Sequence, residues 1–128
     1  MALMTLWLRS LLCVAGLYGA AGVGASAVAA HLAGGASLAT AAQFLLLGAV
    51  TLAGAAALCV NLERGRTAIL VGASAIGLGT LLFSGDLALR TLMEVKLLWG
   101  TAPTGGMLMI AGWLVFAIGG ARASWPKR

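Results

Sequence analysis

The chain has 128 residues and a formal net charge of +5, and 62% of its residues are hydrophobic whereas only 9% are charged. Soluble domains are near half apolar and a quarter charged, so this composition indicates an integral membrane protein and excludes a soluble domain. The basic residues flank apolar segments instead of sharing one exposed face, which argues against a nucleic-acid partner. We expect membrane lipids as its surroundings and one domain over residues 1–128.

Four apolar segments are long enough to cross a bilayer as helices. The first follows Arg9 and carries a cleavage-like pattern at Ala25-Ser26-Ala27, but its apolar run is longer than a signal core, so we expect a retained span. The expected spans are about residues 10–30, 38–60, 67–87 and 98–120. Short turns make neighbouring helices antiparallel. The sequence therefore predicts an all-α membrane protein with an up-down-up-down four-helix bundle.

The connection between the third and fourth spans is longer and patterned. Asp86, Arg90 and Glu94 recur every four residues, which on a helix gives a polar stripe of alternating charge. We expect either a short helix in the outer interface over about residues 87–97 or an extension of the third span. A solvated linker is the simpler alternative.

The distribution of Lys and Arg predicts the orientation. One side of the bilayer receives Arg9, Arg64, Arg66, Arg122, Lys127 and Arg128. The other receives only Arg90 and Lys96. The positive-inside rule places the first group in the cytoplasm, so both termini are expected there and the protein in the bacterial inner membrane. Trp7 and Trp125 on that side, and Trp99 on the other, lie where interfacial indoles usually occur.

Small residues recur at helical spacing in the first, third and fourth spans. Membrane helices associate by close approach through such residues, because lipid already solvates their apolar surface. The residues expected to mediate helix packing are Gly16, Ala20, Gly24, Gly72, Gly77, Gly79, Gly105, Gly106 and Gly112. A dimer face built from the same motif is the alternative.

The sequence offers little for catalysis. A single histidine, two cysteines and three acidic residues make a metal centre, a haem site or a paired-carboxylate site hard to assemble within one chain. The glycines of the third span follow no strand and are not a dinucleotide fingerprint. We expect no metal, no cofactor and no enzymatic activity.

One polar cluster is the best candidate for a site. His31, Gln43, Ser84, Asp86 and Arg90 are all expected near the outer ends of their spans. They could form a small outward-facing pocket with Asp86 as its charge, His31 as a proton acceptor and Gln43 as a hydrogen-bonding wall. The alternative is structural: these side chains cap helices and link them, with Asp86 paired to Arg90 one turn on.

Several short strings, in order and spacing, resemble one family. They are Ala30-His31, Gln43, Gly77-Leu-Gly79-Thr-Leu-Leu-Phe83-Ser84-Gly85, Ala102-Pro103-Thr-Gly105-Gly106 and Gly112-Trp113. Over roughly residues 16–120 the chain resembles domain-of-unknown-function family 423, the YgdD-like small inner-membrane proteins of bacteria, with related proteins in eukaryotes. The resemblance implies a four-helix membrane protein and no activity. This chain departs from the family at Leu46, where members often carry His, and at Asp86, where they carry a small polar residue.

The leading functional prediction is a non-enzymatic membrane protein. It would be an accessory or structural subunit of a larger membrane complex, or a bundle that associates with copies of itself. The first alternative is an oligomeric transporter or channel component built around Gln43, Thr51 and Asp86. The second alternative is a subunit lining a quinone or lipid site.

Overall fold

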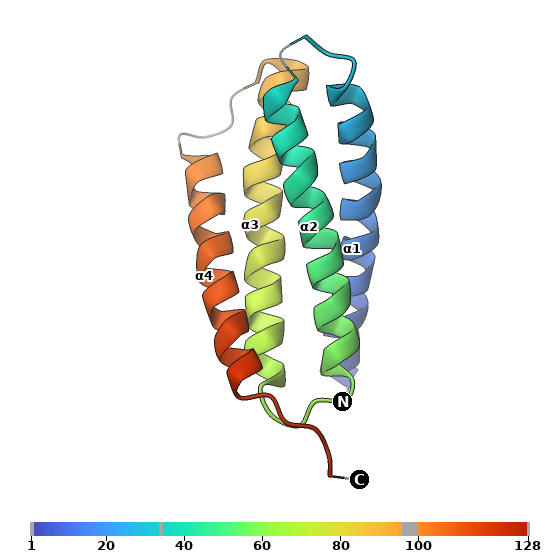
Figure 1. The fold of residues 1–128 in the computed structure, drawn as a ribbon, viewed down its shortest axis with the longest axis vertical. Helices are drawn as coiled ribbons and strands as arrows, with labels where there is room; N and C mark the ends of the chain where they lie inside the picture. The colour runs from blue at the N-terminus through green and yellow to red at the C-terminus, as the bar shows by residue number, and fades with distance from the viewer. Residues whose placement is uncertain (1, 34, 96–99, 128) are drawn as a thin grey trace.

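The computed structural model describes residues 2–33, 35–95 and 100–127, which form four helices. They are α1 (Ala2–Ala29), α2 (Ala36–Cys59), α3 (Arg66–Met93) and α4 (Thr101–Ala121). Each is long and apolar enough to cross a membrane. Successive helices run in opposite directions, and both termini lie at the same end of the molecule (Figure 1). The fold is the predicted all-α up-down bundle.

Two helix boundaries differ from the predicted spans. α1 begins at Ala2 rather than near residue 10, because the residues before Arg9 are mostly strong helix formers such as Leu, Met and Ala. α3 continues to Met93, so residues 87–93 extend the third helix instead of forming a separate interfacial one. Glu94 caps the end of α3 with a φ of 54°, so it does not continue the polar stripe predicted on the helix. Lys96 and Trp99 lie outside the described residues.

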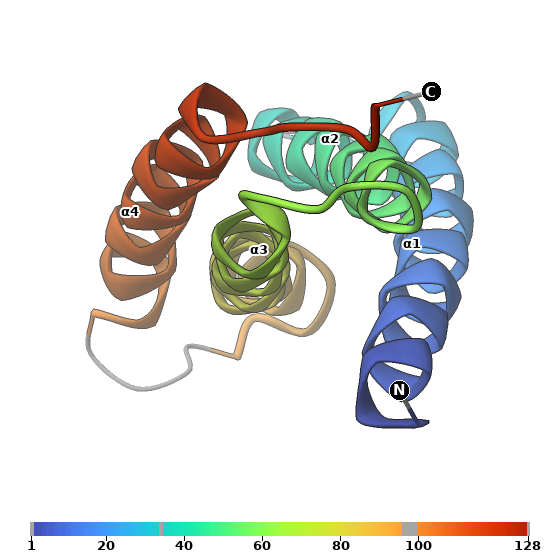
Figure 2. The same cartoon turned by 90° about the horizontal axis from the view of Figure 1, so that it is seen from below.

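The helices are arranged as an open row, in which α3 lies between α4 and α2 and α1 lies beyond α2 (Figure 2). Within the described residues α4 packs against α3 alone, and α1 packs mainly against α2 with a small contact to α3. Part of every helix therefore faces the surroundings. In a bilayer these faces contact lipid or another protein.

Glycines bring α3 and α4 into close contact. A Cβ placed on Gly72 or Gly79 of α3, or on Gly105 or Gly112 of α4, would lie 2.6–2.8 Å from a backbone atom of the other helix. Of the other glycines expected to pack, Gly77 faces Leu52 of α2, and a Cβ on Gly106 would lie 3.9 Å from the ring of Phe83.

The packing expected at Gly16, Ala20 and Gly24 does not occur within the part of the chain that the structure describes. All three are exposed, and a Cβ on Gly16 or Gly24 would meet nothing within 4 Å. α1 instead turns Gly19 and Gly22 toward Ala49 and Leu46 of α2. The reason is that Leu11, Ala15 and Tyr18 lie on the same side of α1 as Gly22, and these larger side chains are buried by the bundle.

Candidate functional site

The length of α4 indicates which part of the bundle would lie in the hydrocarbon layer of a membrane. Its 21 residues span about 31 Å, close to the thickness of the hydrocarbon layer. Gly79 of α3 lies against Gly105 of α4, and α3 runs antiparallel to α4. Asp86, seven residues after Gly79 on the same face of α3, is therefore level with the start of α4, at one boundary of the hydrocarbon.

Asp86 and Arg90 form an ion pair at this boundary. The Asp86 carboxylate is fully buried, and its Oδ2 lies 2.7 Å from an Nη of Arg90, whose side chain is 38% exposed. The separation is that of an ion pair, although its angles fall outside hydrogen-bond geometry. The structural alternative for these two residues, pairing one helical turn apart, is confirmed.

Several polar atoms near this pair lack a hydrogen bond to any described residue. They are Ser84 Oγ, both carboxylate oxygens of Asp86 and Nε of Arg90. Ser84 is fully buried but lies two residues before Asp86, so it points to a different side of α3. The helix thus brings Asp86 to Arg90 and separates both from Ser84.

His31 and Gln43 do not join these residues. His31 is exposed in the turn that follows α1. Gln43 is exposed on α2, and therefore does not face the bundle interior as expected. Thr51 of the same helix is half-buried and donates to the carbonyl of Leu47, so it is satisfied locally. The pocket hypothesis for the five polar residues stays a prediction, now without a shared cavity in the described chain.

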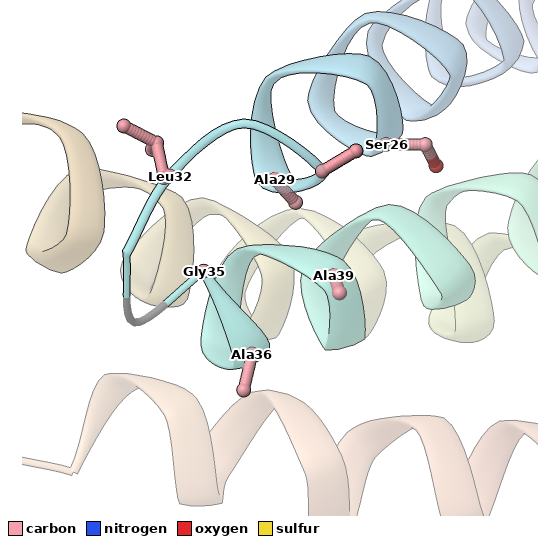
Figure 3. A pocket seen from close by; sticks show the side chains of 7 residues that line it. Ser26, Ala29, Leu32, Gly35, Ala36 and Ala39 are labelled. Carbon is pink, nitrogen blue, oxygen red and sulfur yellow. The ribbon is translucent and has the colours of Figure 1, made fainter.

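A hollow of about 460 Å³ lies beside the α1–α2 turn. In Figure 3, Ser26 and Ala29 extend from the end of α1, and Ala36 and Ala39 from the start of α2. Ser26 is the one polar side chain among the lining residues, most of which are small, and His31 is not among them. The hollow has space for a ligand but offers it few polar contacts.

A second groove, of about 330 Å³, lies between α1 and α3 with Leu52 of α2 among its walls. Two aromatic side chains of α1 cross to α3 here. Trp7 Nε1 donates to Ser74 Oγ at 2.9 Å, and the Tyr18 hydroxyl donates to the Gly77 carbonyl. These bonds hold together two helices that hardly touch elsewhere, and the groove between them is mainly apolar.

Sequence reasoning missed this groove, although a signal was present. Tyr18 is the one tyrosine of the chain and lies inside an apolar span, where a hydroxyl needs a partner. Trp7 was expected at the interface, but its indole is half-buried against α3. Within the described residues, no group of three His, Cys, Asp or Glu side chains could hold a metal ion.

Comparison with known proteins identifies the family. Residues 10–106, most of the chain, match the family described as "Protein of unknown function (DUF423)". The chain belongs to the DUF423 family. This DUF423 chain is also 44% identical over 41 residues to UPF0382 membrane protein SH2409 of Staphylococcus haemolyticus. That alignment covers 32% of this chain and 34% of the relative. No solved structure matches.

The DUF423 match extends from α1 to the first residues of α4 and includes every residue of the polar cluster. The printed name of the relative, a membrane protein, agrees with the four apolar helices of this chain. Neither the family description nor the printed name of the relative states an activity.

Proposed function

We propose that this DUF423 protein is a non-enzymatic component of the bacterial cytoplasmic membrane that acts by lateral association. It would join copies of itself or serve as an accessory subunit of a larger membrane complex. The observation that carries the proposal is the outward face of α1, where Gly16, Ala20 and Gly24 are exposed and no described residue packs on Gly16 or Gly24.

Small residues four apart form a shallow groove along a membrane helix, into which a second helix can fit closely. In this chain the comparable contact between α3 and α4 is already made through Gly72, Gly79, Gly105 and Gly112. The face of α1 has the same kind of residues without a partner helix. This face of α1 can therefore pack against a helix from another chain.

Gln43 supports the same proposal from a second face. Its amide is exposed on α2, and Leu47 and Val50 beyond it are exposed as well. An amide in an apolar surrounding gains from a hydrogen bond to another helix, and Gln is one of the residues that make such bonds between membrane helices.

The proposed orientation places both termini in the cytoplasm. The described part of their end of the molecule carries Arg9, Arg64, Arg66, Arg122 and Lys127. The positive-inside rule favours the cytoplasm for such an end. A fluorescent protein that matures only in the cytoplasm should be bright when fused after residue 128, and an alkaline phosphatase fusion at the same point should be inactive. The reverse pair of results would overturn the orientation.

Lateral association can be tested on the chain purified in a mild detergent. We expect the wild-type protein to migrate as an assembly larger than one copy, and the Gly16→Leu/Gly24→Leu variant to migrate as a single chain. Gly120→Leu, on an exposed position of α4 with open space around it, is the matched control and should behave as wild type. A wild-type protein that is a single chain with no companion rejects the proposal.

The groove between α1 and α3 favours a second candidate function, a wall of a lipid or quinone site. Its lining is mainly apolar, and Ser10, Trp7 and Ser74 bring polar groups to one region of it. Retention of a quinone by the purified chain, lost in Val14→Trp, would favour this candidate. The absence of quinone and of tightly held lipid would reject it.

A further inference from the structure

A third hollow, of about 580 Å³, lies at the end of the molecule that carries both termini. The residues that line it come from the α2–α3 turn, the last residue of α4 and the segment that follows, and they are Arg64, Gly65, Ala121, Arg122, Ala123 and Ser124. Two arginines therefore share one small concave surface. Both are exposed, so their guanidinium groups are open to a ligand.

The backbone fixes these two segments against each other. The amide of Glu63 donates to the carbonyl of Ser124 at 2.9 Å, and Arg64 and Ser124 pair as an antiparallel bridge. Gly65 adopts a φ of 80° and lies so close to the Gly119 carbonyl that any Cβ there would collide with it. These backbone contacts therefore fix the two segments that form the hollow.

The charge of the hollow is positive and unbalanced. Among the described residues, no carboxylate forms an ion pair with Arg64 or Arg122. Glu63, the one acidic residue of this turn, is exposed and does not line the hollow. Arg66 differs, because its guanidinium donates to the Leu62 carbonyl. Two guanidinium groups are therefore available to an anion.

The hollow also lies at the level of lipid headgroups. α4 matches the thickness of the hydrocarbon and ends at Ala121, and α3 begins at Arg66. The residues that line the hollow therefore lie just outside the hydrocarbon layer. Trp125 follows directly and is 57% exposed, as expected of an interfacial indole.

We propose that this hollow binds a phosphate group, carried by the headgroup of an anionic membrane lipid, between Arg64 and Arg122. Arginine recognises phosphate through paired N–H donors, and basic pockets at the ends of membrane helices bind anionic headgroups. The proposal is independent of the lateral association described above, because the hollow lies away from the outward face of α1.

Native mass spectrometry of the full chain in detergent tests the proposal, with short-chain phosphatidylglycerol, short-chain phosphatidylcholine and inorganic phosphate as separate probes. We expect one phosphatidylglycerol to bind more tightly than phosphatidylcholine. Arg64→Gln and Arg122→Gln should each weaken this binding about fivefold, as expected for one basic residue near an anionic surface. The charge-matched variants Arg9→Gln and Lys127→Gln, outside the hollow, should leave it unchanged.

The outcomes separate the possibilities. Equal losses in the hollow and control variants would show a general effect of positive charge and overturn the proposal. Inorganic phosphate competing as well as the lipid would overturn the assignment to a headgroup. The thermal stability of each variant without added lipid reports folding, and Arg64→Lys, which keeps the charge but not the paired donors, should lose part of the binding even where Arg64→Gln does not fold.

Discussion

Gly72 of α3 and Gly112 of α4 face each other so closely that a Cβ on either would lie within 2.7–2.8 Å of the carbonyl oxygen of the other. This reciprocal contact repeats seven residues away, where Gly79 meets Gly105. α4 packs against α3 alone within the described residues, so these two contacts, together with that of Gly119 against Ile69, hold α4 in place. In a membrane such packing replaces the hydrophobic effect as the source of helix association.

Gly72→Ala should therefore destabilise the bundle. The added methyl meets backbone of α4, which cannot move without separating the helices, so we expect a loss of about 1–3 kcal/mol in the free energy of unfolding. Thermal unfolding followed by circular dichroism in detergent measures it. Gly54→Ala, at an α2 position with nothing within 4 Å, is the control and should be neutral or stabilising. Equal stability of the two variants would contradict the contact.

The sequence allowed prediction of the spans and of part of the packing. Apolar length gives the four helices directly. The spacing of Asp86 and Arg90 predicts their ion pair, because residues four apart meet on one helix face. Glycine spacing in α3 and α4 likewise predicts a close contact, and Gly72, Gly79, Gly105 and Gly112 make one.

The faces of α1 and α2 could not be predicted in the same way. In water a helix reveals its buried side by its polar residues, whereas in lipid both sides are apolar. α1 carries small residues on opposite sides, Gly16 and Gly24 on one and Gly19 and Gly22 on the other, and only the latter pair meets α2. Gln43 was expected inside for its polarity but is exposed.

The ion pair near the C-terminal end of α3 provides a second prediction. Arg90→Gln leaves the fully buried Asp86 carboxylate without its charged partner, and should cost about 1–3 kcal/mol, less than for a wholly buried pair because Arg90 is partly exposed. The double variant Asp86→Asn/Arg90→Gln should recover much of this loss, since no unpaired charge remains. Unfolding in detergent of the single and double variants gives the coupling energy.

Glu94→Gln is the control for that cycle. Glu94 is exposed just after α3 ends, so its charge should contribute little. A coupling energy of zero between Asp86 and Arg90 would show that the pair does not stabilise the fold. An equal loss in the free energy of unfolding for Glu94→Gln and Arg90→Gln would show the same.

The Tyr18 hydroxyl should contribute to the stability of the bundle. Tyr18→Phe keeps the ring but removes the donor to the Gly77 carbonyl, and should cost about 1 kcal/mol. Because this bond, like that of Trp7 to Ser74, joins α1 to α3, limited proteolysis of α1 should also become faster. Ser10→Ala is a suitable control, since that hydroxyl bonds only within its own helix, to Leu6. Equal behaviour of the two variants would contradict a bridging role.

The cysteines offer a direct test of which face of α1 meets another copy. Cys13 is exposed and lies seven residues before Ala20, on the same outward face, whereas Cys59 is buried. If copies associate through this face around an axis normal to the membrane, two Cys13 side chains approach at the same depth. Mild oxidation in membranes should then yield a disulfide-linked dimer in wild type and in Cys59→Ser, and none in Cys13→Ser. A large assembly on native gels without this cross-link would instead favour association with a different subunit.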